Sequence, residues 1–149
     1  MNTKKILPPT YLFSALIIML ILHFIFPGIK LILSPWNLFG LFPLIIGIAL
    51  NLAADGALRK AGTTVKPFEK STNLITTGVY RVSRHPMYLG FVLILIGVAI
   101  LLGSAVPWLI IPIFYYLMEV NFIRIEERKL EEQFGSTWSA YKKLVRRWL

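Results

Sequence analysis

The sequence has no cysteine, only two histidines and few acidic residues. The absence of cysteine excludes disulfides and thiolate metal sites. His23 and His85 are too far apart in the chain to form a recognisable metal-ligand spacing, so we expect no metal. Seven acidic residues against 16 lysines and arginines give a net charge of +9. We expect the positively charged residues to bind anionic lipid headgroups and not nucleic acid, because the same chain contains long apolar runs.

Those apolar runs decide the fold class. Hydrophobic residues make up 56% of the chain and charged residues only 15%, which excludes an ordinary soluble domain. The runs cover residues 11–26, residues 36–54, and two stretches within residues 87–118 that are separated at Gly103-Ser104 and Pro107. Each approaches the length of about 20 residues that a membrane-crossing helix needs, and none has the polar face of a soluble bundle helix. The sequence predicts a single all-α domain over residues 1–149, a polytopic integral membrane protein with four transmembrane helices.

The lysines and arginines predict its orientation. All except Lys30 lie before the first run, between the second and third runs, or after the fourth. The positive-inside rule then places both termini, the polar loop 55–86 and the basic tail in the cytoplasm. No cleavage-site pattern follows the first run, which favours a retained anchor over a signal peptide. We expect a cell membrane, the inner membrane of a prokaryote.

The end of the chain is typical of an interfacial helix. The fourth helix is expected to continue through residues 124–133 and to end at Gly135. Beyond it, an apolar face and a basic face alternate with helical spacing. The apolar face contains Trp138, Tyr141, Leu144, Val145 and Trp148, and the basic face contains Lys142, Lys143, Arg146 and Arg147. We therefore expect an amphipathic C-terminal helix at the membrane surface.

Two groups of polar residues stand at the cytoplasmic ends of the third and fourth helices. Residues 78–90 contain two arginines, a histidine and two tyrosines directly before the third run. Pro86 suits the first helical turn, whose free N–H groups favour an anion, and Arg84 offers a planar fork to the same anion. The fourth helix carries Glu126-Glu127, and Glu119 seven residues earlier should share the face of Glu126. The short connection at Gly103-Ser104 makes the two helices antiparallel neighbours, so these groups should meet.

Each of these residues also has a simpler interpretation. Arg81, Arg84 and the acidic pair suit weak surface pairing among headgroups, and the tyrosines suit an aromatic belt. Glu119 is harder to explain in this way, because a carboxylate near membrane depth is costly and is a functional candidate by default. The residues alone therefore predict a polar site between the third and fourth helices, without naming its chemistry.

The two motifs resemble a known family. The first motif is Gly78-x-Tyr80-x-x-x-Arg84-His85-Pro86-x-Tyr88-x-Gly90, and the second, which follows an apolar hairpin, is Glu126-Glu127-x-x-Leu130-x-x-x-Phe134-Gly135. Together they are similar to the pattern of the isoprenylcysteine carboxyl methyltransferase and phospholipid methyltransferase superfamily. The resemblance covers roughly residues 58–149. The chain differs from the family pattern at Trp138, where tyrosine is usual, at Arg146, where proline is common, and at Phe122, where arginine is frequent.

The resemblance implies methyl transfer from S-adenosylmethionine, and the chain indeed lacks the glycine-rich fingerprint of soluble dinucleotide-binding folds. The cofactor-binding residues it implies are Tyr80, Arg84, His85, Tyr88, Glu126 and Glu127, and the catalytic residues are Arg84, Arg124 and Glu119. The acceptor would be lipophilic and enter from the bilayer, as an isoprenylcysteine-like carboxylate or a lipid amine. A carboxylate needs no base, whereas an amine would use Glu119. No obligate protein partner is implied.

Three alternatives remain open at this point. Membrane sterol reductases have a similar Arg-His-Pro-x-Tyr-x-Gly motif and use NADPH, but Met87 and Gly78-Val79-Tyr80 favour the methyltransferase. A non-enzymatic membrane assembly module would not need the intact Arg84, His85 and acidic pair. A methyltransferase acting on a small volatile or soluble acceptor fits the same motifs.

Overall fold

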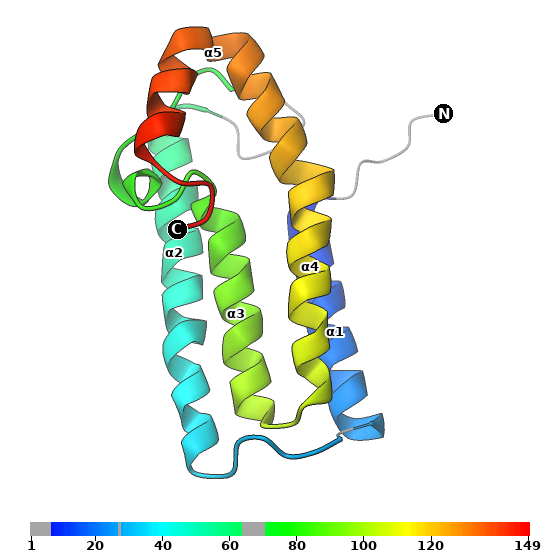
Figure 1. Cartoon of the computed structure of the whole chain (residues 1–149). Helices are drawn as coiled ribbons and strands as arrows, with labels where there is room; N and C mark the ends of the chain where they lie inside the picture. Colours follow the sequence, from blue (N-terminus) through cyan, green and yellow to red (C-terminus); the bar gives the residue numbers. More distant parts are fainter. Residues whose placement is uncertain (1–6, 27, 64–70) are drawn as a thin grey trace.

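The computed structural model describes residues 7–26, 28–63 and 71–149, and its regular elements are helices. They are α1 (Pro8–Ile25), η1 (Trp36–Gly40), α2 (Leu41–Lys60), η2 (Gly78–Arg81), α3 (Pro86–Leu102), η3 (Val106–Leu109), α4 (Ile110–Met118), the π-helical segment η4 (Glu119–Ile123) and α5 (Arg124–Leu144). Helices α1 to α4 alternate in direction along one bundle, and α5 continues α4 beyond the bundle and then turns back (Figure 1). The all-α fold expected from the sequence is confirmed.

The helices suit a membrane by length and composition. Three helical stretches among the described residues are long and apolar enough to cross one, namely Pro8–Ile25, Trp36–Lys60 and Val106–Leu144. Helix α3 is apolar but shorter, at 17 residues. Large hydrophobic side chains such as Phe13, Phe24, Phe42 and Leu52 are exposed on the outside of the bundle. An apolar outer surface of this kind marks contact with lipid, so the protein is a helical membrane protein.

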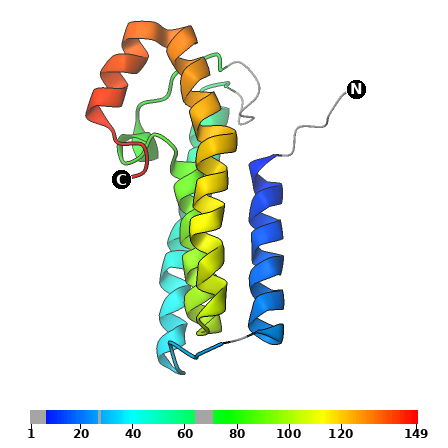
Figure 2. The ribbon, with the colours of Figure 1, turned by 45° about the vertical axis from the view of Figure 1, so that its right-hand side comes forward.

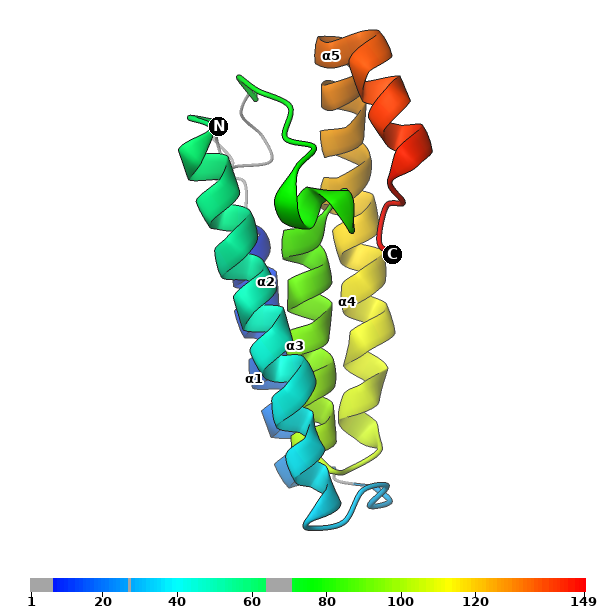
Figure 3. The ribbon, with the colours of Figure 1, turned by 90° about the vertical axis from the view of Figure 1, so that its left-hand side faces the viewer.

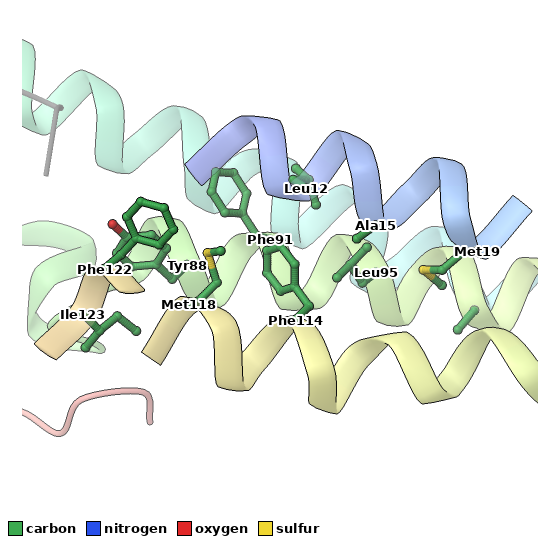
Figure 4. Packing of buried hydrophobic residues seen from close by; sticks show 11 residues of the cluster. Leu12, Ala15, Met19, Tyr88, Phe91, Leu95, Phe114, Met118, Phe122 and Ile123 are labelled. Carbon is green, nitrogen blue, oxygen red and sulfur yellow. The ribbon is translucent and has the colours of Figure 1, made fainter. Parts of the chain in front are cut away.

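The core lies between α1, α3 and α4. Leu12, Ala15 and Met19 of α1 are buried, and they belong to the same cluster as Leu95 of α3 and Phe114 of α4. Figure 4 shows these side chains pointing toward one another between the three helices. Figure 2 shows α1 standing beside α3 and α4 as a separate rod, with its first residue at the same end as α5.

Helices α2 and α3 approach each other more closely than ordinary side chains allow. Gly40 at the end of η1 and Gly47 of α2 face Gly97 and Gly90 of α3, and a Cβ atom built on Gly47 would lie 2.6 Å from the carbonyl oxygen of Gly90. A Cβ on Gly97 would lie 2.7 Å from the carbonyl oxygen of Gly40. Small residues let helix backbones meet in this way in membrane proteins. We call these four residues the glycine seam; Figure 3 shows the two helices running alongside each other.

The opposite end of the bundle is closed by short connections. Gly103 ends α3 in the left-handed conformation, with φ of 71°, and its carbonyl oxygen accepts hydrogen bonds from Leu31 and Ile32. The buried Ser104 hydroxyl lies 2.7 Å from His23 Nδ1, so His23 packs as a partner in this turn. The prediction that α3 and α4 are antiparallel neighbours joined at Gly103-Ser104 is confirmed.

The boundary predicted between the second helix and the polar loop was wrong. Helix α2 does not stop at Ala54 but continues through Lys60. Its last turns contain good helix formers, and Asp55 accepts a hydrogen bond of 2.7 Å from Arg59 Nε one turn later. Residues 64–70 of the predicted polar loop lie outside the described residues.

The fourth helix departs from regular α-helical geometry at η4. The π-helical segment widens the turn there, which adds about one residue before the regular helix resumes. Glu119 therefore lines up with Glu127 and not with Glu126, as Arg147 shows by contacting both Glu119 and Glu127. The prediction that Glu119 shares a helical face with Glu126 assumed a constant helical repeat.

Helix α5 bends at Gly135, which has φ of 46° and ψ of −115°, as expected for the residue that ends the fourth helix. The helix then returns toward the bundle and ends at Leu144. Trp138, Tyr141 and Val145 form a buried cluster against Leu74, Leu130 and Phe134.

The predicted apolar face of the C-terminal helix is only partly correct. Leu144 is 85% exposed, and Trp148 stacks on Tyr115 from beyond the helix end. The chain leaves the helix in extended geometry at Val145, so residues further on do not follow the helical repeat. The buried part of the face contacts the protein itself and not a lipid surface. Arg147, predicted on the outer basic face, points inward for the same reason.

Candidate functional site

A cavity of about 280 Å³ lies at the end of the bundle beneath α5. Its wall brings together the beginnings of α1 and α3, the last turns of α2, and α5. Five of the residues predicted for the site line it, namely Tyr80, Arg84, His85, Tyr88 and Glu126. Phe91, Trp138, Tyr141 and Leu130 add an aromatic and apolar lining. A mixed wall of this kind suits a ligand with both a charged and a flat apolar part.

The segment before α3 holds its polar side chains in fixed positions. The buried Ser83 hydroxyl accepts a hydrogen bond from the His85 backbone N–H at 3.1 Å, and Pro86 occupies the first turn of α3. The start of α3 has no side-chain cap. Backbone N–H groups at such an end favour a negative charge.

Glu127 is the shared partner of Arg84 and His85. Its Oε1 lies 3.1 Å from Arg84 Nη2 and 3.2 Å from His85 Nε2. Because a carboxylate only accepts hydrogen bonds, His85 Nε2 carries a proton here. The side chains of Arg84, His85 and Glu127 are all buried. Glu127 therefore fixes the direction of both Arg84 and His85.

Arg84 has hydrogen-bonding capacity to spare. Its side chain is only 7% exposed, yet its Nε and Nη1 atoms have no hydrogen-bond partner among the residues that the structure describes. The guanidinium lies 5.6 Å from the centre of the Trp138 ring. A buried guanidinium with two unpaired nitrogens is costly, and an anion in the cavity would supply the missing acceptors.

The two neighbouring carboxylates have different surroundings. Glu126 lines the cavity, its side chain is 32% exposed, and its Oε2 accepts a hydrogen bond of 3.3 Å from Tyr88. Glu127 is buried behind Arg84 and His85 and is absent from the described cavity wall. Glu126 is thus the carboxylate that a ligand in the cavity can reach.

Sequence reasoning missed Arg147. Its Nη1 donates to Glu119 Oε1 at 2.5 Å, and its Nη2 and Nε donate to Glu127 Oε2 at 2.5 Å and 3.1 Å. These hydrogen bonds to Glu127 raise the pKa of Arg147. The signal that could have indicated it is the pattern Tyr141-x-x-x-Val145-x-Arg147-Trp148, which is also similar to the family pattern described above.

Glu119 and Arg124 lie apart from the cavity wall. Arg124 Nε is 3.5 Å from Glu119 Oε1, and Trp148 Nε1 donates to Glu119 Oε2 at 3.4 Å. Arg124 is otherwise exposed, with a side chain that is 62% accessible. The predicted catalytic role of both residues stays a prediction.

Two tyrosines of the cavity wall, Tyr80 and Tyr141, are linked to each other. The Tyr141 hydroxyl donates to the Tyr80 carbonyl oxygen at 2.6 Å, which ties the returning part of α5 to η2. Burial, with the negative charge of Glu126 as a further cause, raises the pKa of the Tyr80 phenol. Tyr80 is therefore a neutral ring at physiological pH.

Comparisons with known proteins match this architecture to methyltransferases. Residues 36–137 match the model of the phospholipid methyltransferase family. The chain is 30% identical over 125 residues to protein-S-isoprenylcysteine O-methyltransferase A of Arabidopsis thaliana, which covers 81% of this chain and 62% of that protein. It is 39% identical over 72 residues to the Saccharomyces cerevisiae protein-S-isoprenylcysteine O-methyltransferase, covering 48% of this chain and 30% of that one.

A solved structure has the same fold. The structure of a eukaryotic intramembrane Ras methyltransferase, isoprenylcysteine carboxyl methyltransferase, superimposes with a TM-score of 0.72 at 25% identity. The match covers 95% of this chain and 51% of that chain. The chain therefore spans less than two thirds of the length of the Arabidopsis relative and about half of the solved structure.

Proposed function

The chain belongs to the phospholipid methyltransferase family, and from this premise we propose that it transfers a methyl group from S-adenosylmethionine to a lipophilic acceptor in the membrane. The names of the relatives favour an isoprenylcysteine-like carboxylate as the acceptor. Family membership favours methyl transfer over the sterol-reductase and assembly-module alternatives.

The observation that carries this proposal is the unpaired side of Arg84. S-adenosylmethionine has a carboxylate, an ammonium, a sulfonium and an adenine. The Nε and Nη1 atoms of Arg84, together with the uncapped start of α3, fit the carboxylate. The residues present therefore fit this cofactor.

The rest of the cavity wall fits the other parts of the same molecule. Glu126 is placed to accept hydrogen bonds from an ammonium or from ribose hydroxyls. The faces of Tyr80 and Tyr88 suit a sulfonium through cation–π contacts. His85 lines the cavity between the two carboxylates, with Nε2 donating to Glu127 and Nδ1 lying 3.7 Å from Glu126 Oε2. Glu127 would act behind this wall, through Arg84 and His85.

The protein would contribute to the reaction by positioning the reactants and by excluding water from the site. When bound, S-adenosylmethionine supplies a methyl group on a positively charged sulfur. An ionised carboxylate acceptor can attack such a methyl without a base. Glu119 is held by Arg147, Arg124 and Trp148 and is not part of the cavity wall, which favours a carboxylate over an amine that needs a base. Arg84 and the aromatic wall would hold the reactants and exclude water.

Methyl transfer to a small S-farnesylated cysteine with a free carboxylate tests the proposal. The purified protein should form a base-labile methyl ester from S-adenosylmethionine labelled in the methyl group. His85→Ala should lower the rate by about tenfold or more, because it removes a cavity residue that Glu127 orients.

The other histidine provides the control. His23→Ala changes a histidine at the far end of the bundle, beside Ser104, and should keep the parental rate. Labelling of a lipid amine and not of the carboxylate would move the acceptor to the other class. No labelled product with either acceptor would contradict the proposal.

We also propose that residues 1–149 form one membrane domain with four spans, both termini and the α2–α3 connection being cytoplasmic. Helix α3 lies in the bundle beside α2 and α4, and its 17 residues reach about 26 Å at the helical rise. The starts of α1 and α3 and the basic residues of α5 lie at one end of the bundle, while Lys30 lies at the other (Figure 1).

Cysteine labelling tests this topology without a background, because the chain has no native cysteine. Single cysteines at the exposed positions Thr77 and Ser136 should react with an impermeant maleimide only from the cytoplasmic face. A cysteine at the exposed Lys30 should react only from the opposite face; Ser104 is unsuitable because it is buried. Reaction of positions 30 and 77 from the same face would contradict four spans.

A further inference from the structure

The last residues of the chain are built into the wall behind the site. The Arg84 backbone N–H donates to the Arg146 carbonyl oxygen at 3.0 Å, and the Ser83 hydroxyl donates to the Arg147 carbonyl oxygen at 3.0 Å. Trp148 stacks on Tyr115 of α4 with ring centres 4.5 Å apart. The segment therefore has one fixed path across the start of α3, and this path directs the Arg147 side chain inward.

Arg147 occupies one side of Glu127 completely. Glu127 Oε2 accepts from two nitrogens of Arg147, while Oε1 accepts from Arg84 and His85. The third contact of the Arg147 fork, to Glu119, anchors it on the same helix face across the π-helical segment. Arg84 is thereby limited to a single contact with Glu127, through Nη2.

We propose that Arg147 is a positioning residue for the cofactor: by occupying Glu127 Oε2, it leaves the Nε and Nη1 atoms of Arg84 available to the carboxylate of S-adenosylmethionine. This inference rests on the proposed function. Without Arg147, Glu127 Oε2 would be an unpaired buried acceptor, and Arg84, which already contacts Oε1 of the same carboxylate, has two spare nitrogens to donate to it. A bidentate Arg84–Glu127 pair would form and turn the fork away from the cavity.

The proposal predicts that a variant without Arg147 loses affinity only for a ligand that has the carboxylate. S-adenosylmethionine and its decarboxylated analogue both contain the adenosine, the sulfonium and the ammonium, but only the first has the carboxylate. Calorimetry on the purified full chain should show the parent protein binding S-adenosylmethionine more tightly than the analogue by about tenfold or more, as expected for a charge-assisted hydrogen bond. Arg147→Gln should bring the two affinities within about threefold of each other, mainly by weakening the binding of S-adenosylmethionine.

Two further variants make the test specific. Arg146→Gln removes an exposed neighbouring arginine whose contact with Arg84 is through the backbone, and it should keep the parental preference. Arg147→Lys keeps the charge but replaces the planar fork by a single ammonium, which cannot reproduce the two-nitrogen contact with Glu127 together with the contact with Glu119, so it should show an intermediate preference. If Arg147→Gln does not fold, the ligand preference of Arg147→Lys tests the proposal in its place.

Equal weakening of both ligands by Arg147→Gln would mean that Arg147 only supports the fold, and it would overturn the proposal. Parental preference in Arg147→Gln or in Arg147→Lys would overturn it as well. If the parent binds neither ligand, the proposed function itself fails. If the parent binds both but without preference, the carboxylate is held elsewhere, and the inference about Arg147 fails alone.

Discussion

Replacing Arg84 by lysine should lower the rate of methyl transfer by about a hundredfold at saturating S-adenosylmethionine, because small misplacements cost that much in positioned reactions. The guanidinium has one nitrogen on Glu127 and two that remain unpaired at the cavity. A lysine ammonium keeps the positive charge but has a single nitrogen, which cannot serve Glu127 and a ligand in the same planar geometry. Initial rates of transfer of labelled methyl to the farnesylated cysteine measure the effect.

Arg81→Lys is the matched control. Arg81 lies three residues earlier in η2, and its side chain is exposed. This variant makes the same chemical change without touching the cavity wall and should keep the parental rate. A near-parental rate in Arg84→Lys would show that Arg84 acts only as a charge, and the role assigned to its fork would be wrong.

A leucine at Gly47 should unfold the protein at a temperature lower by roughly 5–10 °C, since overpacking costs about 1–3 kcal/mol or more. The first atom of any side chain at Gly47 meets the carbonyl oxygen of Gly90 at 2.6 Å and the Ile94 backbone nitrogen at 2.9 Å. Backbone atoms cannot move aside as a flexible side chain can, so α2 and α3 would have to separate. Thermal unfolding in detergent, followed by the loss of helical signal, measures the shift.

Gly56 provides the control on the same helix. A Cβ atom at Gly56 would meet nothing within 4 Å. Gly56→Leu also replaces a poor helix former by a good one, which favours the helix by about 1 kcal/mol. Its unfolding temperature should therefore equal or exceed that of the parent. If Gly47→Leu and Gly56→Leu unfold at the same temperature, the close approach at the glycine seam does not limit stability.

Much of the bundle could be predicted from hydrophobicity and charge. The apolar runs located all four helices of the bundle, and Gly103 marked the tight turn between the third and fourth because a left-handed residue is needed there. The convergence of Arg84 and His85 with the acidic pair followed from that antiparallel hairpin. These features depend on local pattern and on a short connection, both of which can be read along the chain.

The errors arose where geometry left the regular repeat. Glu119 was placed on the same face as Glu126 because a constant repeat was assumed, whereas η4 inserts a wider turn and aligns Glu119 with Glu127. Arg147 was placed on an outer face because the helix was assumed to continue past Leu144. The path of the chain after Leu144 depends on contacts with distant residues, namely Ser83 and Tyr115, which no local pattern announces.

The glycine seam also restricts the routes by which a hydrocarbon chain can reach the cavity. Where Gly47 meets Gly90, backbone lies directly against backbone, and an acyl or prenyl tail has no room to pass between α2 and α3. Helix α1 packs on α3 and α4, which closes the opposite side. The cavity wall contains Leu7 and Pro8 at the start of α1 and Leu58 near the end of α2, so the cavity extends between those two helices. We therefore expect the tail of a lipophilic acceptor to slide in between α1 and α2.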